Sequence, residues 1–310
     1  MLTSSIVIAT GDRPQQLARC LAALRRNEAP DVEIVVVDSA PTRRPAEHVA
    51  GEWRARYIRE DKPGASRSRN AGARAARGEV ILFVDDDSLP DVGWMHALAA
   101  EFDDERVMAA AGAVRPPGDP ESLTAADRVA MWMGLSYCGG PVRRVIDKTT
   151  PQWFEIALFG GIGIGPNMAV RRSAFDFWPG FDERLGPGSV IAGAEEPYAF
   201  FSLIDMGCRV AYSPVAVVRH PFPQHSAETL KARYLRSLTI STAYLAFLLT
   251  ERPADRAKVL KYFMEGVCGK RRAWREQPDP PELELAPQAL RLGAYLKGIP
   301  LGIRGRRHPC

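Results

Sequence analysis

Three adjacent carboxylates, Asp85, Asp86 and Asp87, are the residues best placed to do chemistry, because they follow directly after an apolar segment. Neighbouring carboxylates repel one another, and a bound divalent cation would relieve that repulsion. Oxygen ligands favour Mg²⁺ or Mn²⁺ over Zn²⁺. Such a cation can hold a diphosphate and stabilise it as a leaving group. Taken alone, the cluster fits a solvated acidic turn equally well.

The segments that lead up to this cluster alternate between strand-like and helix-like patterns. Apolar runs at 5–9, 33–37 and 80–84 predict three strands. A helix is expected to start at Pro14, with Leu17, Cys20, Leu21 and Leu24 on one face. Further helices are expected over 64–77, with Gly78 as its C-cap, and over 91–102.

Continuous apolar strands that alternate with helices indicate a parallel sheet covered on both faces. In such sheets, ligands bind beyond the carboxyl ends of the strands. Polar residues follow all three predicted strands, at 10–13, 38–39 and 85–87. We therefore expect these three groups to meet at one edge of the sheet.

The rest of the chain has three different patterns. Residues 114–165 are rich in Pro and Gly, which is typical of long loops, with one short helix expected near 125–133. A helix is expected to start around Gly193 and to stop at Gly207, followed by two short strands that end at His220. From Ser226 onward the pattern is helical and increasingly basic, which fits either an anionic membrane surface or a solvated appendage packed on the domain.

Composition narrows the class of protein. The chain has 310 residues, 46% hydrophobic and 25% charged, as in globular proteins. A formal net charge of +4 is too mild for a nucleic-acid binder but suits anionic ligands. Its five scattered cysteines include no C-x-x-C pair, which argues against a zinc site or a disulfide framework and for a reducing compartment. The first residues lack a signal-peptide pattern, and no apolar run is long enough to span a bilayer. We expect a cytoplasmic protein, with peripheral contact to the inner membrane face as an option for the basic tail.

Six segments together resemble glycosyltransferase family 2, whose members have the GT-A fold, and the resemblance covers roughly residues 4–222. Each motif is weak alone, but their order and spacing agree. The segments are Ser5 to Thr10, Val35 to Ser39, Pro63 to Gly72, Phe83 to Asp87, Gly180 to Glu183 and Gly193 to Glu196.

This resemblance implies an α/β fold with a single Rossmann-like, mostly parallel central sheet flanked by helices. It implies that residues 1–222 form the GT-A domain, with a nucleotide-binding half at 1–113 and an acceptor and catalytic half at 114–222. Residues 223–310 then form a basic helical C-terminal extension.

The resemblance also implies roles for individual residues. The donor nucleotide is expected to contact the strand ends and the segment after Pro63, where Gly64 lets the backbone approach. Asp85 and Asp87 match the D-x-D pair that holds the metal and the donor, with Asp87 as the more direct ligand. His220 matches a position that touches the metal or the diphosphate. The expected donor-binding residues are Thr10, Arg13, Asp38, Gly64, Arg69, Asp85 and Asp86.

Glu195 and Glu196 match an acidic motif at a helix start whose second member is the catalytic base. Glu196 occupies that position, where the family motif has Asp, so either of the two glutamates can be the base. A carboxylate there takes the proton of the acceptor hydroxyl as the new bond forms. The resemblance implies a single displacement with inversion, through an oxocarbenium-like state.

Several of these residues also have ordinary structural explanations. His220 could be a satisfied surface histidine, with His225 as a second candidate for its role. Arginines on an Ala-rich helix are usually solvated, so only Arg69 is carried forward, on the motif match.

Two other classes of function stay open. A metal-dependent nucleotidyltransferase would use similar carboxylates, although it often carries an early Gly-rich loop with Lys or Arg, and residues 10–14 lack one. A non-catalytic nucleotide-sugar-binding protein could keep the fold without turnover. For the transferase, a UDP-sugar is the first donor to consider and dTDP-rhamnose the second. The acceptor hydroxyl could belong to a lipid-linked sugar, a polysaccharide or a small natural product.

Overall fold

The computed structural model describes residues 2–27, 32–39, 45–118, 140–220, 227–267 and 286–305. The chain divides into two compact units. The first comprises Met1–Pro120, Ser136–Glu183 and Glu195–Phe222, and the second comprises Glu121–Leu135, Arg184–Ala194 and Pro223–Cys310. The helix expected near 125–133, His225 and three of the cysteines lie outside the described residues, and Cys20 and Cys208 are free thiols.

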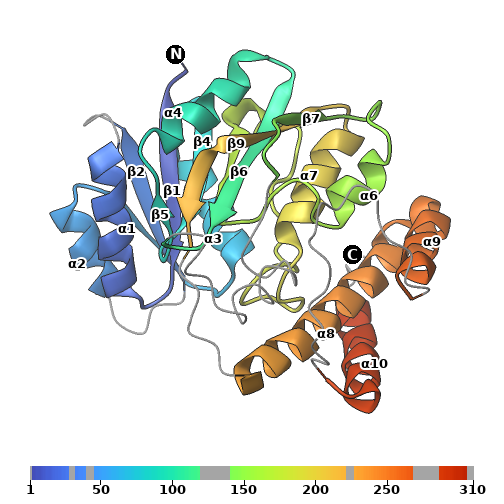
Figure 1. Cartoon of the computed structure of the whole chain (residues 1–310). Helices are drawn as coiled ribbons and strands as arrows, with labels where there is room; N and C mark the ends of the chain where they lie inside the picture. The colour runs from blue at the N-terminus through green and yellow to red at the C-terminus, as the bar shows by residue number, and fades with distance from the viewer. Residues whose placement is uncertain are drawn as a thin grey trace. The chain divides into compact units, whose positions relative to one another are not determined.

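The first unit is built on a mixed sheet, to which the described residues contribute nine strands (Figure 1). The strand order is β3-β2-β1-β4-β8-β6-β9-β5, and β7 pairs with β9. The strands are β1 (Ser4–Thr10), β2 (Glu33–Ser39), β3 (Arg56–Glu60), β4 (Val80–Asp85), β5 (Leu89–Pro90), β6 (Val107–Arg115), β7 (Arg144–Ile146), β8 (Met168–Arg171) and β9 (Arg209–Arg219).

The strands β2, β1 and β4 are parallel, as the sequence predicts, and β3, which the sequence pattern did not predict, pairs parallel with β2. Thr10 pairs with Asp38 in the register of β1 and β2. Ala9 pairs with Asp85 in the register of β1 and β4. The three predicted strand ends therefore meet at one edge of the sheet.

The other half of the sheet mixes directions, because β8 runs antiparallel to both β4 and β6. The prediction of two short strands before His220 is wrong, since a single strand, β9, covers that segment. Its pairing with β6 jumps from Ser213 to Val217 where β6 advances by one residue. Pro214 lies in this bulge, and a proline cannot donate a hydrogen bond to the strand ladder.

Helices cover both faces of this sheet. The side chains that the sequence places on one face of α1 are fully buried, which confirms that prediction. The helix predicted over 91–102 is shorter, and its last turn is a 3-10 helix at Ala100–Asp103. The helices of the first unit are α1 (Pro14–Asn27), α2 (Pro45–Glu52), α3 (Ala65–Ala75), α4 (Trp94–Ala99), α6 (Trp153–Leu158) and α7 (Glu195–Asp205), with a further 3-10 helix at Arg172–Asp176.

The core on one face lies between the sheet and α1, α2 and α4. The helix α3 packs against β1 and β2. A Cβ at Gly72 of α3 would overlap the side chain of Val7, so a glycine is needed for this close approach. Helix α3 is thereby held beside the strand ends that carry the acidic cluster.

After residue 226, the described part of the second unit is mainly helical. It contains α8 (Ala227–Glu251), a 3-10 turn at Pro253–Asp255, α9 (Arg256–Val267) and α10 (Gln288–Arg304). Figure 1 shows α10 beside α8, and the two helices pack along much of their length. Among the described residues, no helix is both long and apolar enough to cross a membrane.

Candidate active site

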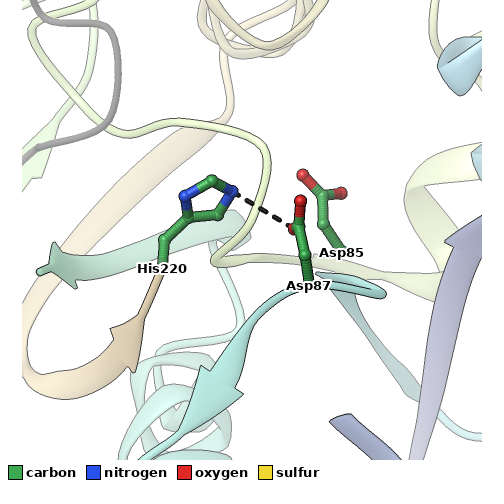
Figure 2. Close-up of side chains that lie close together, drawn as sticks. All are labelled: Asp85, Asp87 and His220. Atoms are coloured by element: carbon green, nitrogen blue, oxygen red, sulfur yellow. Dashed lines mark ion pairs between the residues drawn. The ribbon is translucent and has the colours of Figure 1, made fainter. Parts of the chain in front are cut away.

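Asp85, Asp87 and His220 form a compact group of potential metal ligands. Asp85 ends β4, Asp87 follows two residues later, and His220 follows β9. The pairing of Leu89 in β5 with Arg219 in β9 brings the histidine to the acidic cluster. Figure 2 shows the imidazole of His220 directed at the carboxylate of Asp87, with the carboxylate of Asp85 beside it; Nε2 of His220 lies 3.2 Å from Oδ1 of Asp87.

The dimensions of this group suit a divalent cation. One ligand atom from each side chain lies within 4.8 Å of the other two. Side chains this close together could each supply one ligand atom to the same cation. Two carboxylates and one imidazole are a donor set that accepts Mn²⁺ or Mg²⁺.

Asp86 points to a different set of partners from its two neighbours. Its side chain is fully buried, and its Oδ2 accepts a hydrogen bond from the hydroxyl of Thr10 at 2.6 Å. Its Oδ1 lies 2.7 Å from Nη2 of Arg13, which also reaches Oδ2 of Asp87 at 3.3 Å through Nη1. Thr10 and Arg13 therefore connect the end of β1 to the acidic cluster.

Burial and pairing shift the pKa values of Asp86, Asp87 and His220 in different directions. Burial, together with the charges of Asp85 and Asp87, raises the pKa of Asp86 to about 7 against the lowering effect of Arg13 and Thr10. Burial also acts to raise the pKa of Asp87, but His220 and Arg13 outweigh it and lower that pKa. For His220, burial lowers the pKa, and the hydrogen bond and charge of Asp87 raise it overall.

Arg69 of α3 links the potential metal ligands to the acidic pair at the start of α7. Only 3% of its surface is exposed. Its Nη1 donates to Oε1 of Glu195 at 2.9 Å, and its Nη2 lies 3.3 Å from Oδ1 of Asp85. Its guanidinium also lies 5.8 Å from the ring centroid of Phe181, within cation–π range.

The two adjacent glutamates have different surroundings. Glu195 is buried against Arg69, whereas Glu196 is only partly buried and its Oε1 accepts a hydrogen bond from the main-chain N–H of Gly165 at 2.7 Å. A Cβ at Gly165 would overlap both Oε1 of Glu196 and Nη2 of Arg69, so the glycine leaves room for these two side-chain ends. The chain at Gly165 thus fixes where the Glu196 carboxylate lies.

The environment of Glu196 favours its protonated form. Burial and the charge of Glu195 raise its pKa, with a smaller contribution from Asp85, although Arg69 acts in the opposite direction. Burial lowers the pKa of Arg69, but the charges of Asp85, Glu195 and Glu196 raise it overall. Arg69 therefore stays cationic, and Glu196 has the elevated pKa typical of a carboxylate that exchanges a proton.

The remaining predicted donor residues lie at the same edge or close to it. Asp38 is fully buried, its Oδ2 accepts a hydrogen bond from the hydroxyl of Tyr57 at 3.1 Å, and burial raises its pKa. Gly64 precedes α3 with φ of +141°, a conformation that favours glycine, and its carbonyl accepts from the N–H of Ser68. The structure brings Thr10, Arg13, Asp38 and Asp85–Asp87 to one edge and joins Arg69, Glu195 and His220 to them.

Sequence reasoning missed two residues that hold the site together. Asn70 makes two hydrogen bonds to the main chain of Phe181, at 2.8 and 2.9 Å. Asn167 donates to the carbonyls of Ala113 and Ala216 and accepts from the indole N–H of Trp94. Both are buried amides whose partners are distant in the chain, so no local pattern could identify their role.

Comparison with known families gives a match over more than half of the chain. The model of the family described as "Glycosyl transferase family 2" matches residues 5–178. An N-acetylglucosaminyltransferase of Mesorhizobium japonicum is 26% identical over 79% of this chain and 57% of its own length. A pre-mycofactocin glycosyltransferase of Mycobacterium tuberculosis is 26% identical over 51% of this chain and 30% of its own length. The chain thus spans less than two thirds of these relatives.

Solved structures show the same fold at low sequence identity. A mannosyltransferase of Pyrobaculum calidifontis, in complex with GDP-Man and Mn²⁺, superimposes with a TM-score of 0.55 and 16% identity over 98% of this chain and 74% of its own. TarS 1–349 of S. aureus gives a TM-score of 0.57 and 14% identity over 98% and 81%. GalNAc-T7 with UDP, GalNAc and Mn²⁺ gives a TM-score of 0.54 and 18% identity over 86% of this chain and 55% of its own.

Proposed function

The chain belongs to glycosyl transferase family 2, and from that premise we propose that it transfers a sugar from a nucleotide-diphosphate sugar to an acceptor hydroxyl with inversion at the anomeric carbon. One observation carries most of the weight. Arg69 contacts both Asp85, one of the potential metal ligands, and Glu195, which is next to the proposed base. Groups suited to a leaving diphosphate and a group suited to deprotonating an acceptor therefore belong to one connected network.

On this proposal, the donor lies along the sheet edge where β1, β2 and β4 end. Asp38 would bind the nucleoside, with Thr10, Arg13 and Asp86 shaping the wall behind it. Asp85, Asp87 and His220 would hold Mn²⁺ or Mg²⁺, which when bound neutralises charge on the departing diphosphate. Solved structures of the same fold in complex with Mn²⁺ and either GDP-Man or UDP support this choice of ion and donor class.

We assign the base to Glu196 rather than Glu195. Glu195 is almost wholly buried and already pairs with a cation, so its charge balances Arg69. Glu196 is partly exposed, is held by a main-chain N–H, and has a raised pKa. A carboxylate with a raised pKa is the stronger base once deprotonated, as the removal of a hydroxyl proton requires.

The division of labour along the chain stays part of the proposal. Residues 1–113 supply the nucleotide-binding half of the donor site, residues 114–222 supply His220, the base and part of the acceptor site, and residues 223–310 are the basic helical extension. The nucleotide that the protein binds decides which sugar donor to use in acceptor screens. UDP is the first candidate and dTDP the second, and GDP is added because of the mannosyltransferase neighbour.

A thermal-shift panel tests the proposal. The protein is heated with UDP, dTDP, GDP and their sugars, with and without Mn²⁺. A ligand that binds the folded state raises the melting temperature according to its concentration relative to its Kd. We expect one nucleotide to give a shift that depends on Mn²⁺. A folded sample that responds to no nucleotide would contradict the proposal.

A further inference from the structure

Helix α10 exposes a continuous apolar stripe. Leu292, Leu296, Ile299 and Ile303 are between 43% and 59% exposed. Their spacing of four, three and four residues places them on one face, because an α-helix turns about 100° per residue. Apolar side chains of this size normally pack into a core. On α10 they face away from the helix that α10 packs against.

The opposite face of α10 explains why these side chains point outward. Ala294, Gly298 and Gly302 are buried. A Cβ at Gly298 would overlap the main-chain carbonyl of Thr239 in α8, and a Cβ at Gly302 would overlap that of Ala243. The two helices are therefore in backbone contact, and α10 cannot rotate its large apolar residues toward α8 without separating from it.

Helix α9 shows a second stripe of the same kind. Leu260, Phe263 and Met264 are exposed and recur at i, i+3 and i+4, whereas Val259 and Tyr262 are buried. Lysine follows or interrupts both stripes, with Lys261 on α9 and Lys297 on α10, both exposed. Each helix thus presents aliphatic side chains with basic residues beside them.

Basic residues are concentrated in the part of the chain that carries the two stripes. Residues 223–310 contain 16 Lys and Arg against 8 Asp and Glu. Residues 1–222 contain 25 Lys and Arg against 29 Asp and Glu. The segment that carries the exposed stripes is therefore strongly basic, and the remainder is acidic, so attraction to an anionic surface would act on the helical segment alone.

We propose that the exposed stripes of α9 and α10 bind to the surface of an anionic lipid bilayer without crossing it. Apolar stripes of Leu, Ile, Phe and Met would enter the boundary between headgroups and acyl chains, and the adjacent lysines and arginines would contact acidic headgroups. The charge asymmetry selects lipid over a second copy, since two equally basic surfaces would repel. This inference is independent of the sugar-transfer proposal.

Vesicle flotation of the full chain tests the inference. The vesicles contain either phosphatidylcholine alone or phosphatidylcholine with about one third phosphatidylglycerol. We expect binding to the anionic vesicles that weakens as salt rises from 0.1 to 0.5 M NaCl, conditions chosen for their short Debye lengths. Little binding is expected to neutral vesicles.

Two variants separate the apolar and the electrostatic parts. Leu292→Ser with Leu296→Ser should weaken partitioning about tenfold or more, and Lys261→Glu with Lys297→Glu about tenfold. The matched control, Val142→Ser with Val215→Ser, removes exposed apolar side chains from the first unit and should bind like the wild type. Circular dichroism and thermal melts verify that every variant is folded.

Three results would overturn the inference. The first is a wild type that fails to float with anionic vesicles at 0.1 M NaCl, and the second is a leucine variant that floats as well as the wild type. Equally, sedimentation velocity could show a dimer that the leucine substitutions dissociate, with no binding to vesicles, and the stripe would then be a contact between copies.

Discussion

The guanidinium of Arg69 and the carboxylate of Glu195 form a buried ion pair, with Nη1 2.9 Å from Oε1 and both residues 3% exposed. A buried charge that loses its partner is costly, so each residue holds the other in place. Glu196, the next residue, is bound instead to the main chain at Gly165. The pair therefore supports our proposal that Glu195 has a structural role and that Glu196 is the base.

Replacing Glu196 with Gln should lower kcat by at least about 100-fold, because the amide cannot accept the acceptor's proton. Donor binding should persist, since the side chain keeps its shape and its hydrogen-bond acceptor. Initial rates with the donor found by thermal shift, together with the shift itself, measure the two effects. Full activity in this variant would remove Glu196 from the role of base.

Replacing Glu195 with Gln should act mainly on stability. It leaves the buried Arg69 with Asp85 as its remaining ion-pair partner among the described residues, and we expect a loss of about 3 kcal/mol in the free energy of unfolding. Urea denaturation measures the change. Glu183→Gln is the matched control, because Glu183 pairs with Arg67 near the surface and its loss should cost less than about 1 kcal/mol. Equal losses in the two variants would contradict the structural role of Glu195.

The rate should depend on pH through Glu196. Burial and the neighbouring Glu195 raise the pKa of Glu196, so its basic form fills only as pH rises through that raised value. We expect kcat to increase with pH, with an acidic limb well above the ordinary range of a glutamate. The pH profile of kcat at saturating donor and Mn²⁺ measures this limb. A limb near pH 4 would show that the reaction does not depend on a carboxylate in this environment.

Gly165→Ala should reduce activity more than stability. The added methyl group would displace Oε1 of Glu196 and Nη2 of Arg69, which are both side-chain ends that can move at modest cost. We expect kcat to fall about tenfold or more while the free energy of unfolding changes by about 1 kcal/mol or less, since a small displacement of a catalytic group has a large effect on rate. Gly51→Ala, where a Cβ meets nothing within 4 Å, is the control and should leave kcat unchanged.

Sequence patterns predicted three of the four strands in the parallel half of the sheet and the meeting of their ends, because buried strands and amphipathic helices leave local patterns. They missed β3, none of whose side chains is fully buried. The amphipathic face of α1 and the start of α7 followed from the same rules. Patterns could not predict β8, which runs antiparallel between β4 and β6, since strand direction depends on distant pairing. The single strand β9, with its bulge at Pro214, was predicted as two short strands for a similar reason.

Within the site, the acidic cluster and Glu195–Glu196 were visible because they combine charge with a position at the end of a strand or the start of a helix. The different surroundings of the two glutamates, on which our proposed roles rest, were not visible, since they depend on Arg69 and on the N–H of Gly165. These partners lie 126 and 31 residues away in the chain, respectively. Asn70 and Asn167 were missed for the same reason.

Binding of Mn²⁺ in the presence of the donor nucleotide tests the central claim most directly, with the loss of the free-ion signal in electron paramagnetic resonance as the readout. We predict that Asp87→Ala and His220→Ala weaken Mn²⁺ binding at least about tenfold. The exposed controls Asp103→Ala and His48→Ala should bind it like the wild type. Unchanged Mn²⁺ affinity in both site variants would contradict the assignment of Asp85, Asp87 and His220 as the metal site of a sugar-transfer centre.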